Sequence, residues 1–226
     1  MTARISLVDS DADRNAVYRF RYDIYVEEMK RVQTYADHQL KTIQEPLDET
    51  GNLLIAEENG RTVGTARFNV GVNESFRFYT DLYQLRSFGP FFPRHISITS
   101  KLMVAPEYRR SFLPRQLSVC CYVHGLRLGT AFDFIDCNSP LVPFFSKLGY
   151  RQVFPNILHP EYGNVVPMVL AMHDRAHLEK VRSPLARYAR KAIQNKESLL
   201  FFRDMLRSLQ PTFKSRNSAL SASPVL

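Results

Sequence analysis

The fold is decided between residues 95 and 130, where the chain reads HISITSKLMVAPEYRRSFLPRQLSVCCYVHGLRLGT. The first ten residues alternate and are rich in β-branched side chains, which predicts a strand. Pro106 and two adjacent arginines then break this pattern. From Leu113 to Leu128 the apolar residues are spaced three and four apart, which predicts a helix. Such a strand, basic turn and helix N-terminus favour a phosphate-bearing ligand, because free N–H groups and the helix dipole point at it.

Periodicity on both sides of this unit predicts a mixed architecture of strands and helices. Short alternating runs predict strands, and Asn59-Gly60 between two of them is a strong hairpin signal. Ser183-Pro184 has the chemistry of a helix start, and Gln210-Pro211 that of a helix end. The expected strands cover 4–8, 52–58, 62–69, 95–104, 132–137, 150–154 and 165–172, and the expected helices cover 11–29, 113–128, 139–148 and 184–210.

Length and composition place the chain among ordinary globular proteins. It has 226 residues, of which 45% are hydrophobic and 23% charged. No apolar run approaches the roughly 20 residues that span a bilayer, and the N-terminus leads into a strand pattern. Three cysteines fit neither a disulfide framework nor a zinc site, and the histidines lack ligand spacing. These features predict a cytoplasmic protein without a metal.

Three motifs carry a resemblance to a known superfamily. Residues 101–110 (KLMVAPEYRR) resemble the central acyl-donor motif of the GNAT acyltransferases, and residues 138–150 (NSPLVPFFSKLGY) resemble their next motif. Residues 18–29 (YRFRYDIYVEEM) resemble the N-terminus of acyl-homoserine-lactone synthases and, more closely, that of long-chain N-acyl amino acid synthases. The similarity covers residues 1–173.

The resemblance implies an α/β (α+β) fold in which a mixed, twisted, GNAT-like sheet is flanked by helices, here over residues 1–174. It implies an N-acyltransferase that moves a long-chain fatty acyl group to the amine of an amino acid. No cofactor is expected to stay bound, because the donor brings its own phosphopantetheine thioester on acyl carrier protein or, less favoured, coenzyme A. An acyl-homoserine-lactone-type signal synthase and a non-catalytic, acyl-binding or membrane-associated module are the alternatives.

The same resemblance assigns roles to residues of the predicted site. Two acids of a long acidic loop flank the amine, and a strand bulge aims a backbone N–H near Met103 at the thioester oxygen. The predicted residues are Glu45, Asp48 and Met103 for catalysis, Arg21, Arg67, Ser100 and Lys101 for substrate binding, and Val104, Arg109, Arg110 and Ser111 for the phosphopantetheine donor.

Each of these assignments has a plain alternative. Arg21 could be a solvated charge on the helix surface, and Arg67 an exposed strand residue. Glu45 and Asp48 could belong to an exposed polar loop, and the pattern does not say which of the two would be the base. The aromatic residues between 76 and 92 could line an acyl pocket or belong to the ordinary core.

Three departures from the superfamily pattern bear on the donor and the product. Phe112 and Pro114 stand where glycines usually approach a coenzyme A pyrophosphate, which favours acyl carrier protein as donor. Phe145 stands where a tyrosine often protonates the thiolate. Ile98 replaces a glutamate of the lactone synthases, which argues against lactone chemistry.

The excess positive charge lies in a C-terminal extension. Residues 175–216 hold eleven Lys or Arg and only three acids, which equals the net charge of +8 for the whole chain. We expect a basic amphipathic helical extension over 175–214 and a disordered tail over 215–226. The extension could be a solvated face of a packed helix, a docking surface for acyl carrier protein, or a contact with an anionic membrane through 182–209. Nucleic acid is not expected, because no base-reading motif accompanies the charge.

Overall fold

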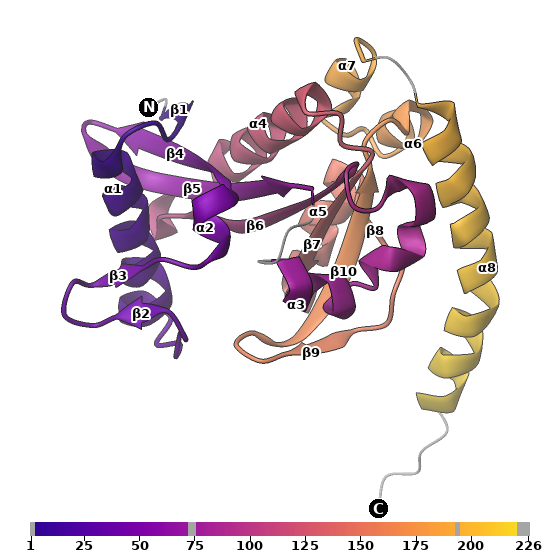
Figure 1. Ribbon diagram of the computed structural model, residues 1–226, viewed down its shortest axis with the longest axis horizontal. Coiled ribbons are helices and arrows are strands. Elements are labelled where there is room, and N and C mark those ends of the chain that lie inside the picture. Colours follow the sequence, from indigo (N-terminus) through magenta and orange to yellow (C-terminus); the bar gives the residue numbers. More distant parts are fainter. Residues whose placement is uncertain (1–2, 72–75, 193–194, 221–226) are drawn as a thin grey trace, which may run out of the picture.

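A single mixed sheet organises the molecule (Figure 1). The computed structural model describes residues 3–71, 76–192 and 195–220, with 209–220 by their backbone alone. In these residues eight strands form the sheet in the spatial order β1-β4-β5-β6-β7-β10-β8, with β9 paired to β10. The strands are β1 Arg4–Leu7, β4 Asn52–Glu58, β5 Arg61–Val70, β6 Ile96–Val104, β7 Phe132–Cys137, β8 Arg151–Gln152, β9 Ile157–His159 and β10 Gly163–Ala171. Two further strands, β2 Ala36–Asp37 and β3 Thr42–Ile43, pair in a small ribbon.

The pairing pattern places one parallel junction at the centre of an otherwise antiparallel sheet. β6 and β7 are parallel, whereas the other pairs described are antiparallel. Asn59 and Gly60 join β4 to β5 with positive φ angles of 52° and 73°, which confirms the predicted tight hairpin. The helices are α1 Asp11–Tyr22, α2 Leu47–Thr50, α3 Arg77–Leu82, α4 Leu113–Arg127, α5 Val142–Leu148, α6 Arg175–Lys180, α7 Ala186–Ala189 and α8 Lys196–Leu220.

Helix α4 covers one face of the sheet. Leu117 and Cys121 of α4 share a buried cluster with Ala66 and Phe68 of β5. The helix approaches β5 closely at Gly125, where an added Cβ would lie 2.7 Å from the Phe68 ring. The predicted strand, basic turn and helix between residues 95 and 130 are therefore confirmed, and glycine is what allows the helix and the sheet to touch.

Helix α1 covers the opposite face at the N-terminal end of the sheet. The Ser10 hydroxyl caps it by accepting the Asp13 N–H. Val17 and Tyr18 pack on β4, and the chain then continues as a π-helical turn over Asp23–Glu28. Arg21 lies on the buried side of α1, so the sheet-facing helix carries a charge into the interior.

The C-terminal extension differs from the single helix predicted after Ser183. The Ser183 hydroxyl accepts the Leu185 N–H and starts a short α7, but a separate helix, α8, begins at Lys196. The Asn195 side chain accepts the Ser198 N–H in the first turn of α8. No helix in the described residues is long and apolar enough to cross a membrane.

The predicted end of the extension is also wrong. Helix α8 continues through Pro211 to Leu220, so this proline does not end the helix although it removes one N–H donor. Residues 215–220 are therefore helical and not part of a disordered tail, whereas residues 221–226 lie outside the described part of the chain. Figure 1 shows α8 running along the side of the molecule opposite α1.

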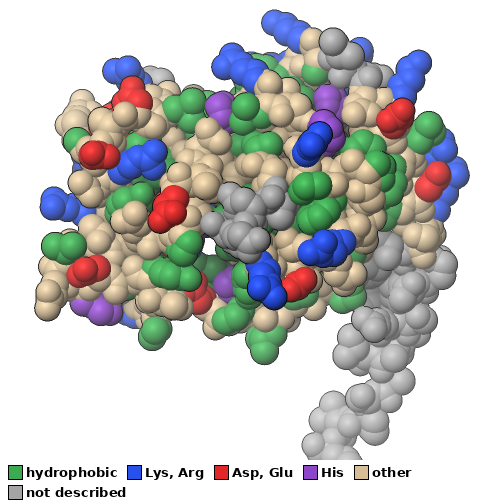
Figure 2. All heavy atoms as spheres, viewed as in Figure 1, with side chains coloured by type: hydrophobic (Ala, Val, Ile, Leu, Met, Phe, Trp, Pro, Cys, Tyr) green, Lys and Arg blue, Asp and Glu red, His purple; other side chains and the backbone are tan. Residues whose placement is uncertain are grey.

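Helix α8 is attached to the core by aromatic side chains. Phe202 is 1% exposed, and its ring centroid lies 5.5 Å from that of Phe132 in β7. Arg151 places its guanidinium 4.5 Å from the centre of the Phe202 ring. The basic side chains of this region remain outside, and Figure 2 shows Lys and Arg side chains along the margin formed by α7 and α8.

Candidate active site

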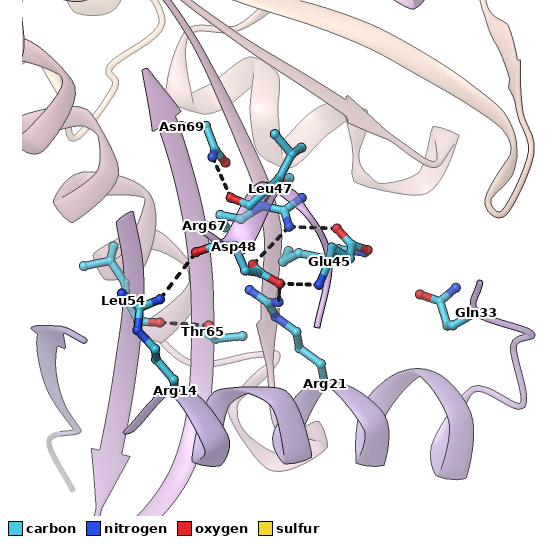
Figure 3. A network of polar contacts seen from close by, with 12 residues as sticks. Arg14, Arg21, Gln33, Glu45, Leu47, Asp48, Leu54, Thr65, Arg67 and Asn69 are labelled. Atoms are coloured by element: carbon cyan, nitrogen blue, oxygen red, sulfur yellow. Dashed lines mark hydrogen bonds and ion pairs between the residues drawn. The ribbon is translucent and has the colours of Figure 1, made fainter. Parts of the chain in front are cut away.

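A buried ion network lies between α1 and the sheet, with Asp48 at its centre (Figure 3). Arg21 of α1 places its Nη1 2.7 Å from Asp48 Oδ2, and Arg67 of β5 places its Nη1 3.0 Å from Asp48 Oδ1. The Glu45 N–H donates to Asp48 Oδ2 at 2.7 Å, and the Glu45 carboxylate lies 2.7 Å from Arg67 Nη1. Arg21, Asp48 and Arg67 are each 0% exposed. The alternatives of solvated arginines and an exposed acidic loop are therefore wrong.

The charges of this network keep its carboxylates ionised. Burial acts to raise the pKa of Asp48, but Arg21 and Arg67 outweigh it and lower the pKa below its usual value. Burial also acts to raise the pKa of Glu45, but the charges of Lys101 and Arg67 outweigh it, so this pKa too is lowered. Each of the four carboxylate oxygens already has a cationic partner. Both acids are therefore engaged and weakly basic.

Lys101 connects this network to a cavity. Its ammonium pairs with the second oxygen of Glu45 and donates to the Tyr162 hydroxyl at 2.6 Å. It also lies 5.0 Å from the centre of the Tyr25 ring, in a cation–π contact. The Tyr162 hydroxyl donates in turn to the Gln33 side-chain oxygen at 3.3 Å. Lys101 is thus fixed from several sides with its side chain 4% exposed.

A β-bulge occurs in β6 at Lys101. Thr65 is paired with Met103 and Arg67 with Ser100, so Lys101 and Leu102 together face one residue of β5. Lys101 has a φ of 53°, which turns the strand locally. Arg67 Nε donates to Ser100 Oγ at 3.1 Å and so ties the bulge to the buried network. The bulge lies beside Met103, where the sequence predicts the backbone donor for the thioester.

The cavity lies where β6 and β7 separate. The two strands pair only from Ile96 to Ile98 of β6, and the cavity of about 630 Å³ opens beyond these residues. This volume is within the range of small-molecule sites. Its wall includes Thr99 and Met103 from β6, Ile135 and Asp136 from β7, Pro114 from α4 and Tyr162 from the loop before β10.

Residues from both faces of β7 line the cavity, because consecutive side chains of a strand point to opposite faces. Ile135 and Cys137 of β7 share a cluster with Phe145 of α5 on one face. Asp136 points to the other face, where its Oδ2 accepts the Tyr83 hydroxyl at 2.6 Å. Burial raises the pKa of Cys137 to about 12, so its thiol stays neutral and contributes an apolar wall.

The structure places all four predicted donor-binding residues on the cavity. Val104, Arg109, Arg110 and Ser111 line it, and both arginines are exposed. Arg109 pairs with Glu28 at 2.6 Å. The backbone of this turn is already bonded internally, since Leu113 N–H donates to Ser111 Oγ at 3.1 Å and Ser111 Oγ donates to the Tyr108 carbonyl at 2.7 Å.

The predicted obstruction of the donor site needs a correction at Phe112. Its side chain is 68% exposed and lies against the Arg115 guanidinium, 4.7 Å from the ring centre, so it does not line the cavity. Pro114 does line the cavity. Phe112 is the N-cap residue of α4, and its exposed ring contacts Arg115 in the first turns of that helix.

The predicted catalytic and substrate-binding residues fall into two groups. Ser100, Lys101 and Met103 line the cavity. The remaining predicted residues, which are Arg21, Glu45, Asp48 and Arg67, lie behind Lys101 in the ion network and do not line it.

Sequence reasoning gave no role to the tyrosine hydroxyls of the cavity. Tyr25, Tyr79, Tyr83 and Tyr162 line it, whereas Phe145 has no hydroxyl to offer. Burial raises the pKa of Tyr79, Tyr83 and Tyr162, so these hydroxyls remain protonated donors. Tyr25 stands in the motif of residues 18–29 and could have been found there, but Tyr162 belongs to a distant loop without a spacing signal.

The aromatic residues between 76 and 92 mostly belong to the core. Phe76, Phe88 and Phe91 are buried in the cluster that includes β7 and α8, and none of them lines the cavity. Tyr79 and Tyr83 are the members of this stretch that reach the cavity. The ordinary-core alternative is therefore confirmed for the three phenylalanines.

Comparisons with known proteins agree with this geometry. A family model described as N-acyl amino acid synthase FeeM matches residues 16–174. Comparison with curated proteins gives no match. Among solved structures, BjaI, a CoA-dependent acyl-homoserine lactone synthase with SAM and isopentyl-CoA, is 18% identical with a TM-score of 0.63 over 84% of this chain and 100% of its own.

Two other solved structures have the same fold. FeeM, an N-acyl amino acid synthase from uncultured soil microbes, is 14% identical with a TM-score of 0.61 over 83% of this chain and 99% of its own. ElaA from Escherichia coli is 13% identical with a TM-score of 0.54 over 74% of this chain and 99% of its own. The mixed, helix-flanked sheet therefore has the GNAT-like acyltransferase architecture that the motifs predict.

Proposed function

We propose, from the premise that this chain belongs to the FeeM family of N-acyl amino acid synthases, that it moves a long fatty acyl group from acyl carrier protein to the amine of an amino acid. Membership of that family makes the chain an acyltransferase and sets aside the non-catalytic alternative. The observation that carries the proposal is the cavity between β6 and β7, which places a strand bulge, an apolar wall and a polar cluster around one space.

The reaction follows from where these parts lie. The thioester carbonyl would rest against the bulge at Lys101, where a backbone N–H near Met103 polarises it. The acceptor amine attacks the carbonyl carbon, so a C–N bond forms and the C–S bond breaks. The thiolate leaves with the electrons of that bond and takes the proton that the nitrogen loses. A protonated tyrosine hydroxyl such as that of Tyr162 can pass this proton on.

The apolar part of the wall supports a fatty acyl substrate. Ile135, Leu141 and Phe144 line the cavity on the α5 side, and Ile24 and Val165 line it elsewhere. Each methylene buried against such a wall contributes about 0.8 kcal/mol. The affinity for the donor should therefore rise with chain length until the cavity is filled.

The turn before α4 supports acyl carrier protein over coenzyme A. The Ser111 N–H donates to the Tyr108 carbonyl and the Leu113 N–H to Ser111 Oγ, which leaves fewer free N–H groups for a pyrophosphate. Arg110 and Arg115 are exposed beside it and would attract an acidic partner. A carrier protein presents one phosphate and no nucleotide. BjaI is described as CoA-dependent, so coenzyme A is the competing donor to be tested.

The buried network would act through Lys101 and Ser100. Arg67 holds Ser100 and Glu45 holds Lys101, so the network fixes both sides of the bulge. We therefore assign Arg21, Glu45, Asp48 and Arg67 to positioning the site, and not to direct contact with the acceptor, because none of the four lines the cavity.

Lactone synthesis is the second candidate, and Ile98 counts against it. Its side chain is 1% exposed in the apolar cluster between β6 and β7, so no acid is present at that position. Ser100 and Lys101, the neighbouring motif positions, are shared with that class. We retain the amino acid as acceptor and a linear N-acyl amino acid as product.

The C-terminal extension would help to recruit the carrier protein. Helix α8 buries Phe202 and leaves Lys196, Arg203 and Arg207 exposed, so its basic side is available to an acidic partner. We propose residues 1–174 as the acyltransferase domain and 175–220 as this extension, working in the cytoplasm. Deleting α8 would strip Phe202 from the core, so charge reversal of the three basic residues is the cleaner test.

The experiment compares donors with purified protein. Palmitoyl acyl carrier protein and palmitoyl-CoA are each supplied with a mixture of amino acids, and amide products are identified by mass spectrometry. We expect amide formation with a kcat/KM at least tenfold higher for the carrier-protein donor. Equal values for the two donors would refute the carrier preference. Charge reversal on α8 should raise KM for the carrier only, and loss of anionic-liposome binding with an unchanged KM would instead indicate a membrane contact.

A further inference from the structure

Asp136 has a position that no other acid of the described chain shares. It is the single carboxylate among the described residues that line the cavity. No Lys, Arg or His nitrogen of the described residues lies within 4.0 Å of it. By contrast, Glu45 and Asp48 lie behind the wall and are paired with cations.

One oxygen of Asp136 is fixed and the other is open. The Tyr83 hydroxyl donates to Oδ2 at 2.6 Å, and no hydrogen bond from a described residue reaches Oδ1. Tyr83 is itself immobilised, since it is 2% exposed and stacks on Phe134 with ring centroids 6.0 Å apart. The carboxylate is therefore held in one orientation by a buried tyrosine while it keeps a free acceptor on the cavity side.

Two of the four cationic residues on the cavity wall have an anionic partner, whereas Asp136 has no cationic partner within 4.0 Å among the described residues. Lys101 is paired with Glu45, and Arg109 is paired with Glu28. Burial raises the pKa of Tyr79, and the charges of Glu45 and Asp136 add to this rise while Arg67 opposes it. An unpaired carboxylate in a partly apolar cavity favours a cationic or N–H-bearing ligand group.

We propose that Asp136 receives the amino group of the acceptor, with Oδ2 held by Tyr83 and Oδ1 accepting an N–H of the substrate. The identification of the ligand group as the acceptor's nitrogen rests on the proposed acyl transfer, whereas the affinity of the cavity for an alkylammonium does not. During attack the nitrogen forms its bond to the carbonyl carbon and becomes positive, and the carboxylate faces this developing charge. The proton then leaves to the thiolate released by the C–S bond.

The kinetic test uses Asp136→Asn, Tyr83→Phe and a matched control. We expect Asp136→Asn to lower kcat/KM for the amino acid about 10- to 100-fold, the range for a hydrogen bond to a charged group, with the donor KM unchanged. Tyr83→Phe, which only releases the carboxylate, should give a smaller loss in the same parameter. Asp81→Asn, an exposed acid on α3, should match the wild type. An unchanged acceptor kcat/KM in Asp136→Asn would overturn the proposal.

A binding test separates this inference from the proposed reaction. Octylamine, which is cationic at pH 7, and octanol are titrated calorimetrically into the wild type and into Asp136→Asn. We expect octylamine binding to weaken at least tenfold in the variant and octanol binding to stay the same. Equal octylamine affinities, or no octylamine binding by the wild type, would overturn the role of Asp136. If the wild type forms no amide but this difference is observed, the proposed reaction fails and the cation site stands.

Discussion

Replacing Asp48 with Asn should strongly destabilise the fold at neutral pH. The side chain keeps its shape but loses its charge, and Arg21 then has no anionic partner within 4.0 Å among the described residues. Arg21 is 0% exposed, and its Nε and Nη2 have no hydrogen-bond partner among the described residues. Removing one member of a buried ion pair costs about 3–5 kcal/mol, because the other charge is left uncompensated. This is a large part of the roughly 5–15 kcal/mol that stabilises a typical protein.

The pH dependence gives this prediction a sign. Arg21 and Arg67 lower the pKa of Asp48 below its ordinary value of 3.8 despite the burial. A depressed folded-state pKa contributes stability that is present above the unfolded value and is lost as the pH falls through the folded value. The difference between wild type and Asp48→Asn should therefore be full at pH 7 and should shrink below pH 4, where the unfolded chain binds a proton at Asp48 before the folded protein does.

Urea unfolding followed by far-UV circular dichroism measures this difference, since the chain has no tryptophan to report by fluorescence. The control is Asp204→Asn, whose carboxylate is 63% exposed beside Arg203, and for which a change of at most about 1 kcal/mol is expected. A loss below about 1 kcal/mol for Asp48→Asn at pH 7, or a loss that is the same at pH 3 and pH 7, would refute the role of the network.

Three further changes test other parts of the structure. Burial raises the pKa of Asp133 to about 6 from 3.8, so the stabilisation from this group is highest below pH 3.8 and is lost as the pH rises through 6. The free energy of unfolding of Asp133→Asn, measured by urea titration relative to that of the wild type, should therefore rise by up to about 3 kcal/mol from pH 4 to pH 8. Phe202→Ala should cost about 3–5 kcal/mol in the same assay, because the ring is 1% exposed in the core, and a change near zero would mean that α8 is not packed there. Lys101→Met should lower kcat/KM at least tenfold in steady-state kinetics, and the fold should tolerate the change because Glu45 keeps Arg67 as its partner. Wild-type rates in this variant would show that Lys101 has no role in the reaction.

The sequence predicts the central parts of this fold because their signals are local. Alternation over residues 95–104 and helical spacing after Leu113 reflect one strand and one helix whose side chains pack on adjacent elements. The pattern alone leaves Arg21 either solvated or turned inward, the resemblance of residues 18–29 favours the inward position, and the structure places Arg21 on the inner side of α1. Each of these predictions depends on residues close together in the chain.

The parts that sequence could not supply depend on distant contacts. Tyr162 is 61 residues from Lys101, yet its hydroxyl is one of the groups that hold the Lys101 ammonium. Asp136 looks like an ordinary strand residue until Tyr83, 53 residues earlier, is seen to donate to it. The packing of α1 against β5 decides that Glu45 and Asp48 face buried arginines and not solvent or substrate. The spacing of residues in the sequence does not reveal this packing.

The structure of a complex with a stable donor analogue tests the central claim most directly. Palmitoyl pantetheine in which an amide replaces the thioester can be soaked or co-crystallised with the protein. We expect the acyl chain to lie between β6 and β7 and the amide oxygen to accept a backbone N–H at the bulge between Lys101 and Met103. An analogue bound elsewhere on the protein, with this cavity empty at a saturating concentration, would contradict it.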